Sequence, residues 1–108
     1  MAHGGVLAGL MDAALGAAAL TLAFTAGELV STVEFKINYL QPVHLGDELR
    51  AVAQVDHAGK SLIVSSAVIY RQAAGEAAET AVAQGLGTFN RYPASRRLGE
   101  ITSQSAPE

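Results

Sequence analysis

A single carboxylate stands within a long apolar stretch near the start of the chain. Asp12 is the only ionisable side chain between Val6 and Phe24. Apolar surroundings disfavour the charged form of a carboxylate, which raises its pKa and makes it a stronger base. The sequence therefore offers Asp12 as a general base or nucleophile in a low-dielectric site. The alternative is a structural carboxylate whose oxygens accept hydrogen bonds from a neighbouring amide or hydroxyl.

Three residues just before this stretch could supply hydrogen-bond donors to a reacting oxygen. His3, Gly4 and Gly5 lead directly into the apolar segment. Glycine permits close approach of the backbone to a ligand, and the first N–H groups of a helix have no acceptor within the helix. Donors of this kind stabilise the oxyanion that develops during acyl transfer. An ordinary glycine turn at a flexible N-terminus is the alternative interpretation.

Two further candidates lie later in the chain, and each also has a simple structural interpretation. Thr32 carries a hydroxyl at the start of a predicted strand, where threonine is a common residue. Lys60 and Ser61 lie in a predicted hairpin turn. They either form a solvated turn or contact phosphate groups. The setting is not that of a P-loop. The chain has no cysteine, and its histidines at positions 3, 44 and 57 lack metal-ligand spacing, so we expect no metal site.

The apolar stretch over residues 6–24 has the three- and four-residue spacing of a helix. The residues at this spacing are Leu7, Leu10, Met11, Ala14, Leu15, Ala18 and Leu22. The opposite side is small and apolar, which predicts a helix that is buried all round. The stretch is also long enough to cross a membrane. Because it contains Asp12, is rich in Ala and Gly, and lacks flanking Lys, Arg or Trp anchors, we expect a core helix and no membrane contact.

Four strands are predicted after the helix, over residues 33–39, 48–57, 61–72 and 79–92. Alternation in the first strand places four apolar side chains on one buried face: Val33, Phe35, Ile37 and Tyr39. The third strand is apolar on both faces, as in a strand that is covered on both sides. In the fourth strand, Gly85 and Gly87 indicate a bulge or a close backbone approach.

A helix followed by strands with short turns predicts an α+β fold, in which the helix lies across one face of an antiparallel sheet. The small-residue side of the helix then needs another partner, and a second copy of the chain is the simplest candidate. We expect one domain over residues 1–92 and a polar, mobile segment over 93–108. The net charge of −3 gives no basic surface for nucleic acid, and no signal peptide is visible, so we expect a cytoplasmic protein.

The motifs of the chain, taken in order, resemble those of a known family. The pattern His3-Gly4-Gly5, Leu10-Met11-Asp12 and Gly16 is similar to the hotdog-fold acyl-CoA thioesterases, in the subgroup typified by phenylacetate-pathway thioesterases. The later landmarks are Thr32-Val33-Glu34-Phe35, Asn38-Tyr39-Leu40-Gln41-Pro42, Gly46-Asp47, Gly59-Lys60-Ser61, Ala83-Gln84-Gly85 and Thr88-Phe89. The resemblance covers residues 3–92 and implies a helix wrapped by an antiparallel sheet.

The resemblance also implies roles for individual residues. Asp12 resembles the catalytic carboxylate, and Gly5 resembles the residue whose N–H holds the thioester oxygen. His3 resembles the motif histidine beside that site, and Gly4 follows it in the motif as a substrate-binding position. Thr32 matches a hydroxyl position that orients water. Lys60 and Ser61 lie where the family often contacts CoA. The family implies an acyl-CoA substrate, no metal or redox cofactor, and homodimers or homotetramers with sites between subunits.

The chain departs from the family pattern at its start. Family members usually carry a segment with a first strand before His-Gly-Gly, whereas only Met1 and Ala2 precede His3 here. Either the chain is a truncated form or the fold has one strand fewer, and in both cases we expect the strand over residues 48–57 to lie at an edge of the sheet. The predicted activity is hydrolysis of an acyl-CoA thioester to a free acid and CoA. The alternatives are a non-catalytic acyl-CoA-binding protein and an esterase acting on oxygen esters.

Overall fold

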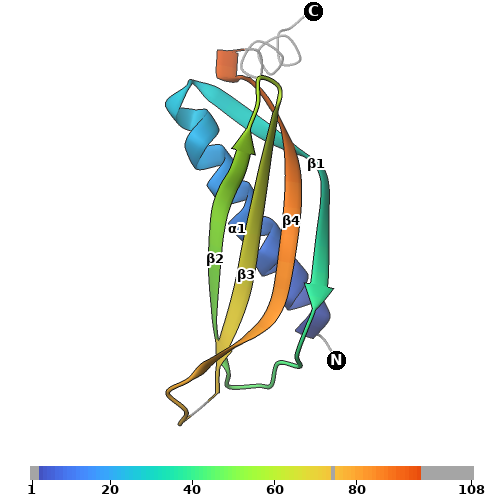
Figure 1. Ribbon diagram of the computed structural model, residues 1–108, viewed down its shortest axis with the longest axis vertical. Helices are drawn as coiled ribbons and strands as arrows, with labels where there is room; N and C mark the ends of the chain where they lie inside the picture. Colours follow the sequence, from blue (N-terminus) through green and yellow to red (C-terminus); the bar gives the residue numbers. More distant parts are fainter. Residues whose placement is uncertain (1–2, 74, 96–108) are drawn as a thin grey trace, which may run out of the picture.

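The computed structural model describes residues 3–73 and 75–95, and for His3 and Gly4 it describes the backbone alone. One long helix precedes four strands in this part of the chain (Figure 1). The elements are α1 (His3–Thr25), β1 (Glu28–Tyr39), β2 (Glu48–Ala58), β3 (Leu62–Gln72) and β4 (Glu79–Pro93). The strands form an antiparallel sheet in the order β1-β4-β3-β2, and α1 crosses one face of it. The predicted α+β arrangement is confirmed.

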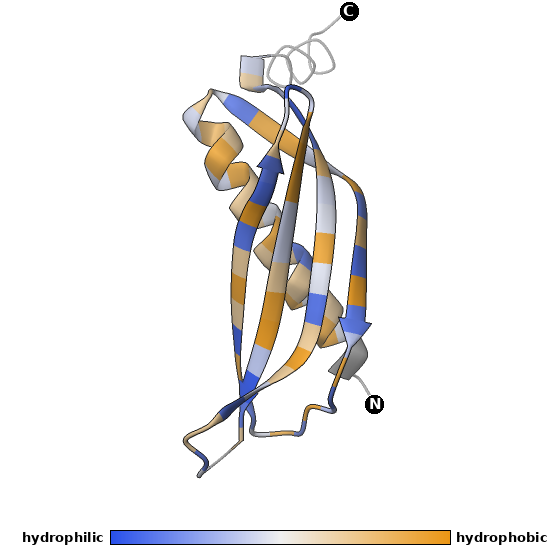
Figure 2. Ribbon diagram, viewed as in Figure 1, coloured by the Kyte–Doolittle hydropathy of each residue, from blue (hydrophilic) through white to orange (hydrophobic). Residues whose placement is uncertain are grey.

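Only one stripe of α1 is buried against the sheet. The buried residues repeat every fourth position and are Leu7, Met11, Leu15, Ala19 and Ala23. The opposite side is also apolar (Figure 2), yet the side chains of Val6 and Phe24 are 58% and 68% exposed. The prediction of a helix buried all round is therefore wrong for the single chain, because one sheet covers only one side of a cylinder.

The segment Gly5–Thr25 is long and apolar enough to cross a membrane, by length and composition. In this chain it packs along the sheet and contributes five residues to the hydrophobic core. The rest of the core comes from the sheet and the loop before β2, and comprises Val43, Ile63, Ala67, Ile69, Val82, Ala83 and Phe89. The buried Ser65 adds a polar tie, since its Oγ donates a hydrogen bond of 3.0 Å to the carbonyl oxygen of Leu15.

The glycines of β4 lie where helix and sheet approach most closely. A Cβ atom on Gly85 would stand 2.6 Å from Sδ of Met11 and 3.0 Å from the carbonyl oxygen of Lys36. A Cβ on Gly87 would stand 2.8 Å from the ring of Phe89. Carbon atoms in favourable contact are about 3.5–4.0 Å apart, so neither position has room for a side chain. The predicted close backbone approach is confirmed.

Strand β1 is longer than predicted and contains an extra residue. Thr32 pairs with Phe89 and Glu34 pairs with Thr88, so that Val33 has no partner in the register with β4. Strict alternation would place Thr32 on the face opposite to Phe35. The extra residue instead puts both on the helix side of the sheet, because cross-strand partners point to the same face.

The predicted buried face of β1 is correspondingly only half right. Ile37 packs against the core. The side chains of Val33 and Tyr39 are 58% and 52% exposed, and that of Phe35 is 36% exposed. Strand β1 lies at an edge of the sheet and pairs only with β4, so its side chains have strand neighbours on one side alone.

The outer face of the sheet, away from α1, is uncovered in the described part of the chain. Strand β3 alternates between buried residues that face α1, such as Ile63, and half-buried or exposed ones on the outer face, such as Leu62 and Val68. The prediction that β3 is covered on both sides is therefore wrong for the single chain. Strand β2 lies at one edge of the sheet, as predicted.

The ends of the elements follow local rules. Gly27, with a φ of 73°, ends the turn after α1 and allows the chain to reverse into β1. Its carbonyl oxygen accepts a hydrogen bond of 3.0 Å from the N–H of Ala94, just after β4. Residues 96–108, most of the predicted mobile segment, lie outside the described residues.

Candidate active site

Asp12 lies in the first half of α1, on a side that the sheet leaves open. Positions 5, 9, 12 and 16 follow one another at helical spacing, so Gly5, Gly9 and Gly16 share this side with Asp12. Glycine neighbours leave room for a ligand along the helix on both sides of the carboxylate. Asp12 is exposed in the single chain, which therefore does not by itself provide the low-dielectric setting predicted from the sequence.

The N–H of Gly5 is available as a donor. Because α1 begins at His3, Gly5 stands in the first turn, where the N–H has no acceptor within the helix. A Cβ on Gly5 would meet no atom of the described chain within 4 Å. Gly5 and Asp12 are about 10 Å apart along the helix axis, at 1.5 Å per residue. The side chain of His3 lies outside the described residues.

Thr32 lies on the helix side of the sheet. Its cross-strand partner Phe89 is buried beneath the helix. The ring of Phe89 lies 3.8 Å from the point where a Cβ on Gly16 would stand. Gly16 follows Asp12 by about one helical turn. Thr32 thus lies near the turn of α1 that contains Gly16, whereas Met11, the neighbour of Asp12, packs at Gly85, four residues away along β4.

Lys60 and Ser61 lie far from these residues within one chain. They form the turn between β2 and β3, at the end of the sheet opposite to the start of α1 (Figure 1). The 23 residues of α1 span about 35 Å at 1.5 Å per residue. A single chain therefore does not bring the hairpin to Gly5. A two-fold axis across the strands would reverse the ends and set the hairpin of one copy beside the helix start of another.

The charged pairs of the chain stand apart from Asp12. The ion pairs among the described residues join Arg50 to Glu79, Arg71 to Asp47, and Arg91 to Glu28. Within residues 3–73 and 75–95, no group of three or more His, Cys, Asp or Glu side chains is placed to hold a metal ion.

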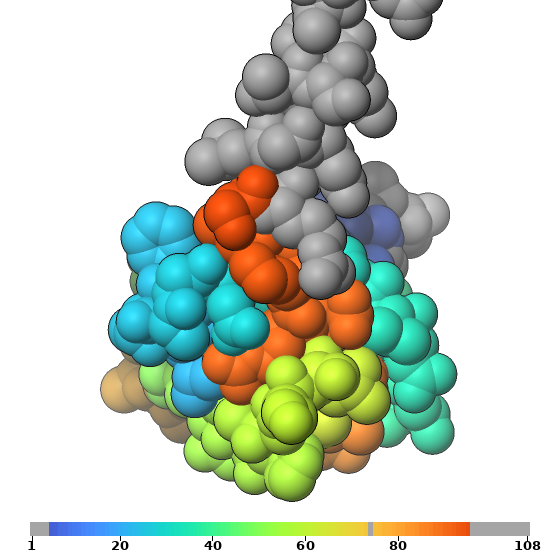
Figure 3. Space-filling view, turned by 90° about the horizontal axis from the view of Figure 1, so that it is seen from above, coloured from blue at the N-terminus to red at the C-terminus, as the bar shows by residue number. Residues whose placement is uncertain are grey.

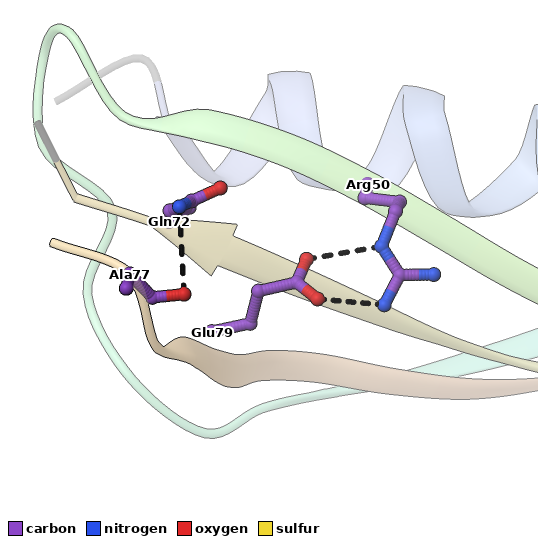
Figure 4. A network of polar contacts seen from close by, with 4 residues as sticks. All are labelled: Arg50, Gln72, Ala77 and Glu79. Carbon is purple, nitrogen blue, oxygen red and sulfur yellow. Dashed lines mark hydrogen bonds and ion pairs between the residues drawn. The ribbon is translucent and has the colours of Figure 1, made fainter.

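In one of these ion pairs, the arginine shifts the pKa of its carboxyl partner. Arg50 donates two hydrogen bonds of 3.0 and 2.8 Å to the carboxylate of Glu79 on the outer face of the sheet (Figure 4). These bonds lower the pKa of Glu79 below its usual value. The guanidinium also lies 5.1 Å from the ring centre of Tyr70. This cluster lies on the outer face of the sheet, whereas α1 with Asp12 lies on the other face.

Sequence reasoning missed two residues that position the candidate groups. Ser65 ties β3 to the carbonyl of Leu15, three residues beyond Asp12. Arg91 binds the β2–β3 hairpin at the carbonyl oxygen of Gly59. Ser65 has a weak sequence signal, since it occupies a position of β3 on the same face as the buried apolar residues Ile63 and Ala67. Arg91 has none, because its partners are distant in sequence.

The thioesterase superfamily model matches residues 1–78 of the chain. Several solved structures are similar. A thioesterase family protein from Silicibacter pomeroyi is 32% identical with a TM-score of 0.68, and covers 82% of this chain and 62% of its own. The BH2602 protein of Bacillus halodurans, solved with CoA, is 31% identical with a TM-score of 0.67, at 82% and 57% coverage.

A third similar structure is the E. coli PaaI protein from the phenylacetic acid degradation operon. It is 30% identical with a TM-score of 0.66, and covers 83% of this chain and 59% of its own. The chain thus spans less than two thirds of the length of these three proteins. No curated protein matches the chain significantly.

Proposed function

The chain belongs to the thioesterase superfamily, and on that premise we propose that it hydrolyses an acyl-CoA thioester to a free acid and CoA. The observation that carries the proposal is the extent of the family match, which includes α1 with Asp12, Thr32 of β1 and the hairpin with Lys60. The similarity to PaaI supports a place in the phenylacetate-pathway thioesterase-like subgroup.

The proposed chemistry needs only side chains, backbone and water. Asp12 accepts a proton from a water molecule that Thr32 orients, and the water oxygen attacks the thioester carbonyl carbon. The N–H of Gly5 donates to the oxyanion of the tetrahedral intermediate. The C–S bond then breaks, the acid forms, and the CoA thiolate takes up the proton. In the nucleophilic variant, the Asp12 carboxylate attacks the carbonyl carbon, and the C–S bond breaks to release the CoA thiolate. Water then hydrolyses the resulting mixed anhydride to the free acid and the Asp12 carboxylate, and the thiolate takes up the proton.

The proposed site forms between two copies of the chain, in a homodimer that can pair into a homotetramer. The exposed apolar side of α1 supports this, since Leu20 and Phe24 are 39% and 68% exposed. A second copy on this side would also exclude water from around Asp12. The opposite placement of Lys60 and Gly5 supports the same arrangement, with the hairpin of one copy and Ser61 reaching CoA at the helix start of the other.

Two other functions remain as alternatives. A non-catalytic acyl-CoA-binding protein would use the same hairpin, with Asp12 as a surface carboxylate. An esterase would act on oxygen esters through the same residues.

We propose a cytoplasmic enzyme that uses no metal or redox cofactor and contacts neither membrane nor nucleic acid.

A panel of acyl-CoA and p-nitrophenyl esters, assayed with the wild type and Asp12→Asn, separates these functions. Asp12→Asn is nearly isosteric and removes the base, so thioester turnover should fall by about 10²–10⁴-fold, the usual contribution of a general base. CoA binding and the circular dichroism spectrum should be unchanged. Equal turnover by the variant would refute the role of Asp12. Binding of CoA without turnover in the wild type would favour the non-catalytic protein.

A further inference from the structure

The β2–β3 hairpin is held at its tip by one side chain from another strand. Figure 3 looks onto this end of the molecule, where the hairpin lies against the end of β4. Arg91 of β4 donates from Nη1 to the carbonyl oxygen of Gly59, at 3.0 Å. Its backbone N–H donates to the carbonyl oxygen of Ser61, at 2.8 Å. The two residues on either side of Lys60 are therefore both fixed to Arg91.

The other edge of the same guanidinium is anchored in turn. Nε and Nη2 of Arg91 lie 2.7 and 2.6 Å from Oε1 of Glu28, the first residue of β1. The side chains of Arg91 and Glu28 are only 14% and 23% exposed, so the pair is largely protected from water. A guanidinium is planar and presents its donors in a rigid fork. Glu28 thus sets the plane of the fork, and the fork sets the position of Gly59.

Lys60 itself is exposed and unpaired among the contacts of the described residues. An ammonium group on a long stem gains affinity for a phosphate only after the cost of ordering its stem and its loop. A hairpin already fixed at Gly59 and Ser61 avoids the loop part of that cost.

We propose that Arg91 is a positioning residue for CoA: it holds the hairpin so that Lys60 meets the phosphates, without touching them itself. This inference rests on the proposed function, because it takes Lys60 as a CoA contact. It adds a residue from β4 to the determinants of affinity, and predicts an effect on CoA binding and KM rather than on the chemical step.

The test compares three variants. Arg91→Lys keeps a cation for Glu28 but lacks the fork that also reaches Gly59. Arg50→Lys is the matched control, since it removes the guanidinium of an ion pair that lies on the outer face of the sheet, away from the hairpin. Lys60→Ala tests the CoA contact itself. For each we would measure the Kd for CoA by calorimetry, kcat and KM with an acyl-CoA, and hydrogen exchange of the Gly59 amide. That amide is protected by a 2.7 Å bond to the carbonyl of Leu62.

We expect Arg91→Lys to raise the Kd and KM about three- to tenfold, the range for an extra ordering step on binding, with kcat unchanged. Exchange at Gly59 should accelerate while exchange at Ala67, in the middle of β3, stays as in the wild type. Arg50→Lys should leave the Kd as in the wild type, because its partner Glu79 lies away from the hairpin. Because Arg91 acts through Lys60, adding Arg91→Lys to Lys60→Ala should have little further effect.

Two results would overturn the positioning role while the proposed function stands. One is a wild-type Kd in Arg91→Lys although Lys60→Ala weakens binding. The other is weaker binding without faster exchange at Gly59, which would make Arg91 a direct ligand contact. A wild-type protein that binds no CoA would refute the proposed function and the CoA role of Arg91 together. The exchange measurement would then still decide whether Arg91 holds the hairpin.

Discussion

Replacing Gly85 by alanine tests how closely α1 approaches the sheet beside Asp12. The new Cβ would stand 2.6 Å from Sδ and 2.9 Å from Cγ of Met11, and 3.0 Å from the carbonyl oxygen of Lys36. Met11 is fully buried, so its side chain has no open space to enter. The Lys36 oxygen belongs to the backbone of β1 and moves only with that strand. Relief of the overlap therefore requires a shift of about 1 Å between α1 and β4, to restore ordinary contact distances.

The magnitude follows from two opposing terms. Overpacking a core costs about 1–3 kcal/mol of unfolding free energy. Replacing glycine by alanine in a strand recovers about 0.5–1 kcal/mol of conformational entropy. The net expectation is a destabilisation of about 1 kcal/mol, which lowers the melting temperature of a domain of this size by about 4–8 °C.

Thermal unfolding followed by circular dichroism would measure this shift. The protein concentration must be held fixed, because association raises apparent stability. Gly16→Ala is the matched control: its Cβ would make an ordinary contact of 3.8 Å with Phe89. It should raise stability by up to about 1 kcal/mol, as alanine does over glycine inside a helix. If Gly85→Ala melts at or above the wild-type temperature, the reasoning about a tight helix–sheet contact fails.

Two further predictions concern assembly and pH. Light scattering at micromolar concentration should give at least twice the chain mass of 11.1 kDa, and Ala17→Arg on the exposed side of α1 should shift it toward one chain; a monomeric, active wild type would contradict the inter-subunit site. Arg50 lowers the folded-state pKa of Glu79, so the pair's contribution to stability is present above the unfolded value of about 4.3 and disappears as pH falls through the folded pKa. The urea midpoints of wild type and Glu79→Gln should therefore converge in acid, and divergence there would contradict the assignment.

The helix and the four strands could be predicted because they depend on local periodicity, whereas the order β1-β4-β3-β2 depends on pairings between residues distant in sequence. Three- and four-residue spacing identifies the buried stripe that contains Leu7, Met11 and Leu15. Alternation identifies each strand, but it cannot reveal an extra residue. It therefore predicts a buried side chain for Val33, which has no partner in the register with β4. An apolar helix likewise does not disclose which side faces its own sheet and which side a partner would have to cover.

The candidate site was predictable in part for a related reason. Asp12 and Gly5 share a helix, so their common side follows from the sequence. The position of Lys60 at the far end of the sheet depends on strand order and on the direction of α1, which local patterns do not fix. The contacts of Ser65 with Leu15 and of Arg91 with Gly59 join residues 50 and 32 positions apart. A local pattern can place Ser65 on the buried face, but it cannot identify the partner of either residue.

The two edges of the sheet bear on whether copies of the chain could join into filaments. In the described chain β1 and β2 both end the sheet, so a head-to-tail joining of β1 to β2 could repeat without limit, whereas a two-fold joining of like edges closes after two copies. Val33 on β1 and Asp56 on β2 are each an extra residue that interrupts the regular ladder. Open-ended growth would need both interrupted edges to pair at once, while a closed dimer needs only one. The irregularity of the edges therefore favours finite assemblies over filaments during synthesis and storage.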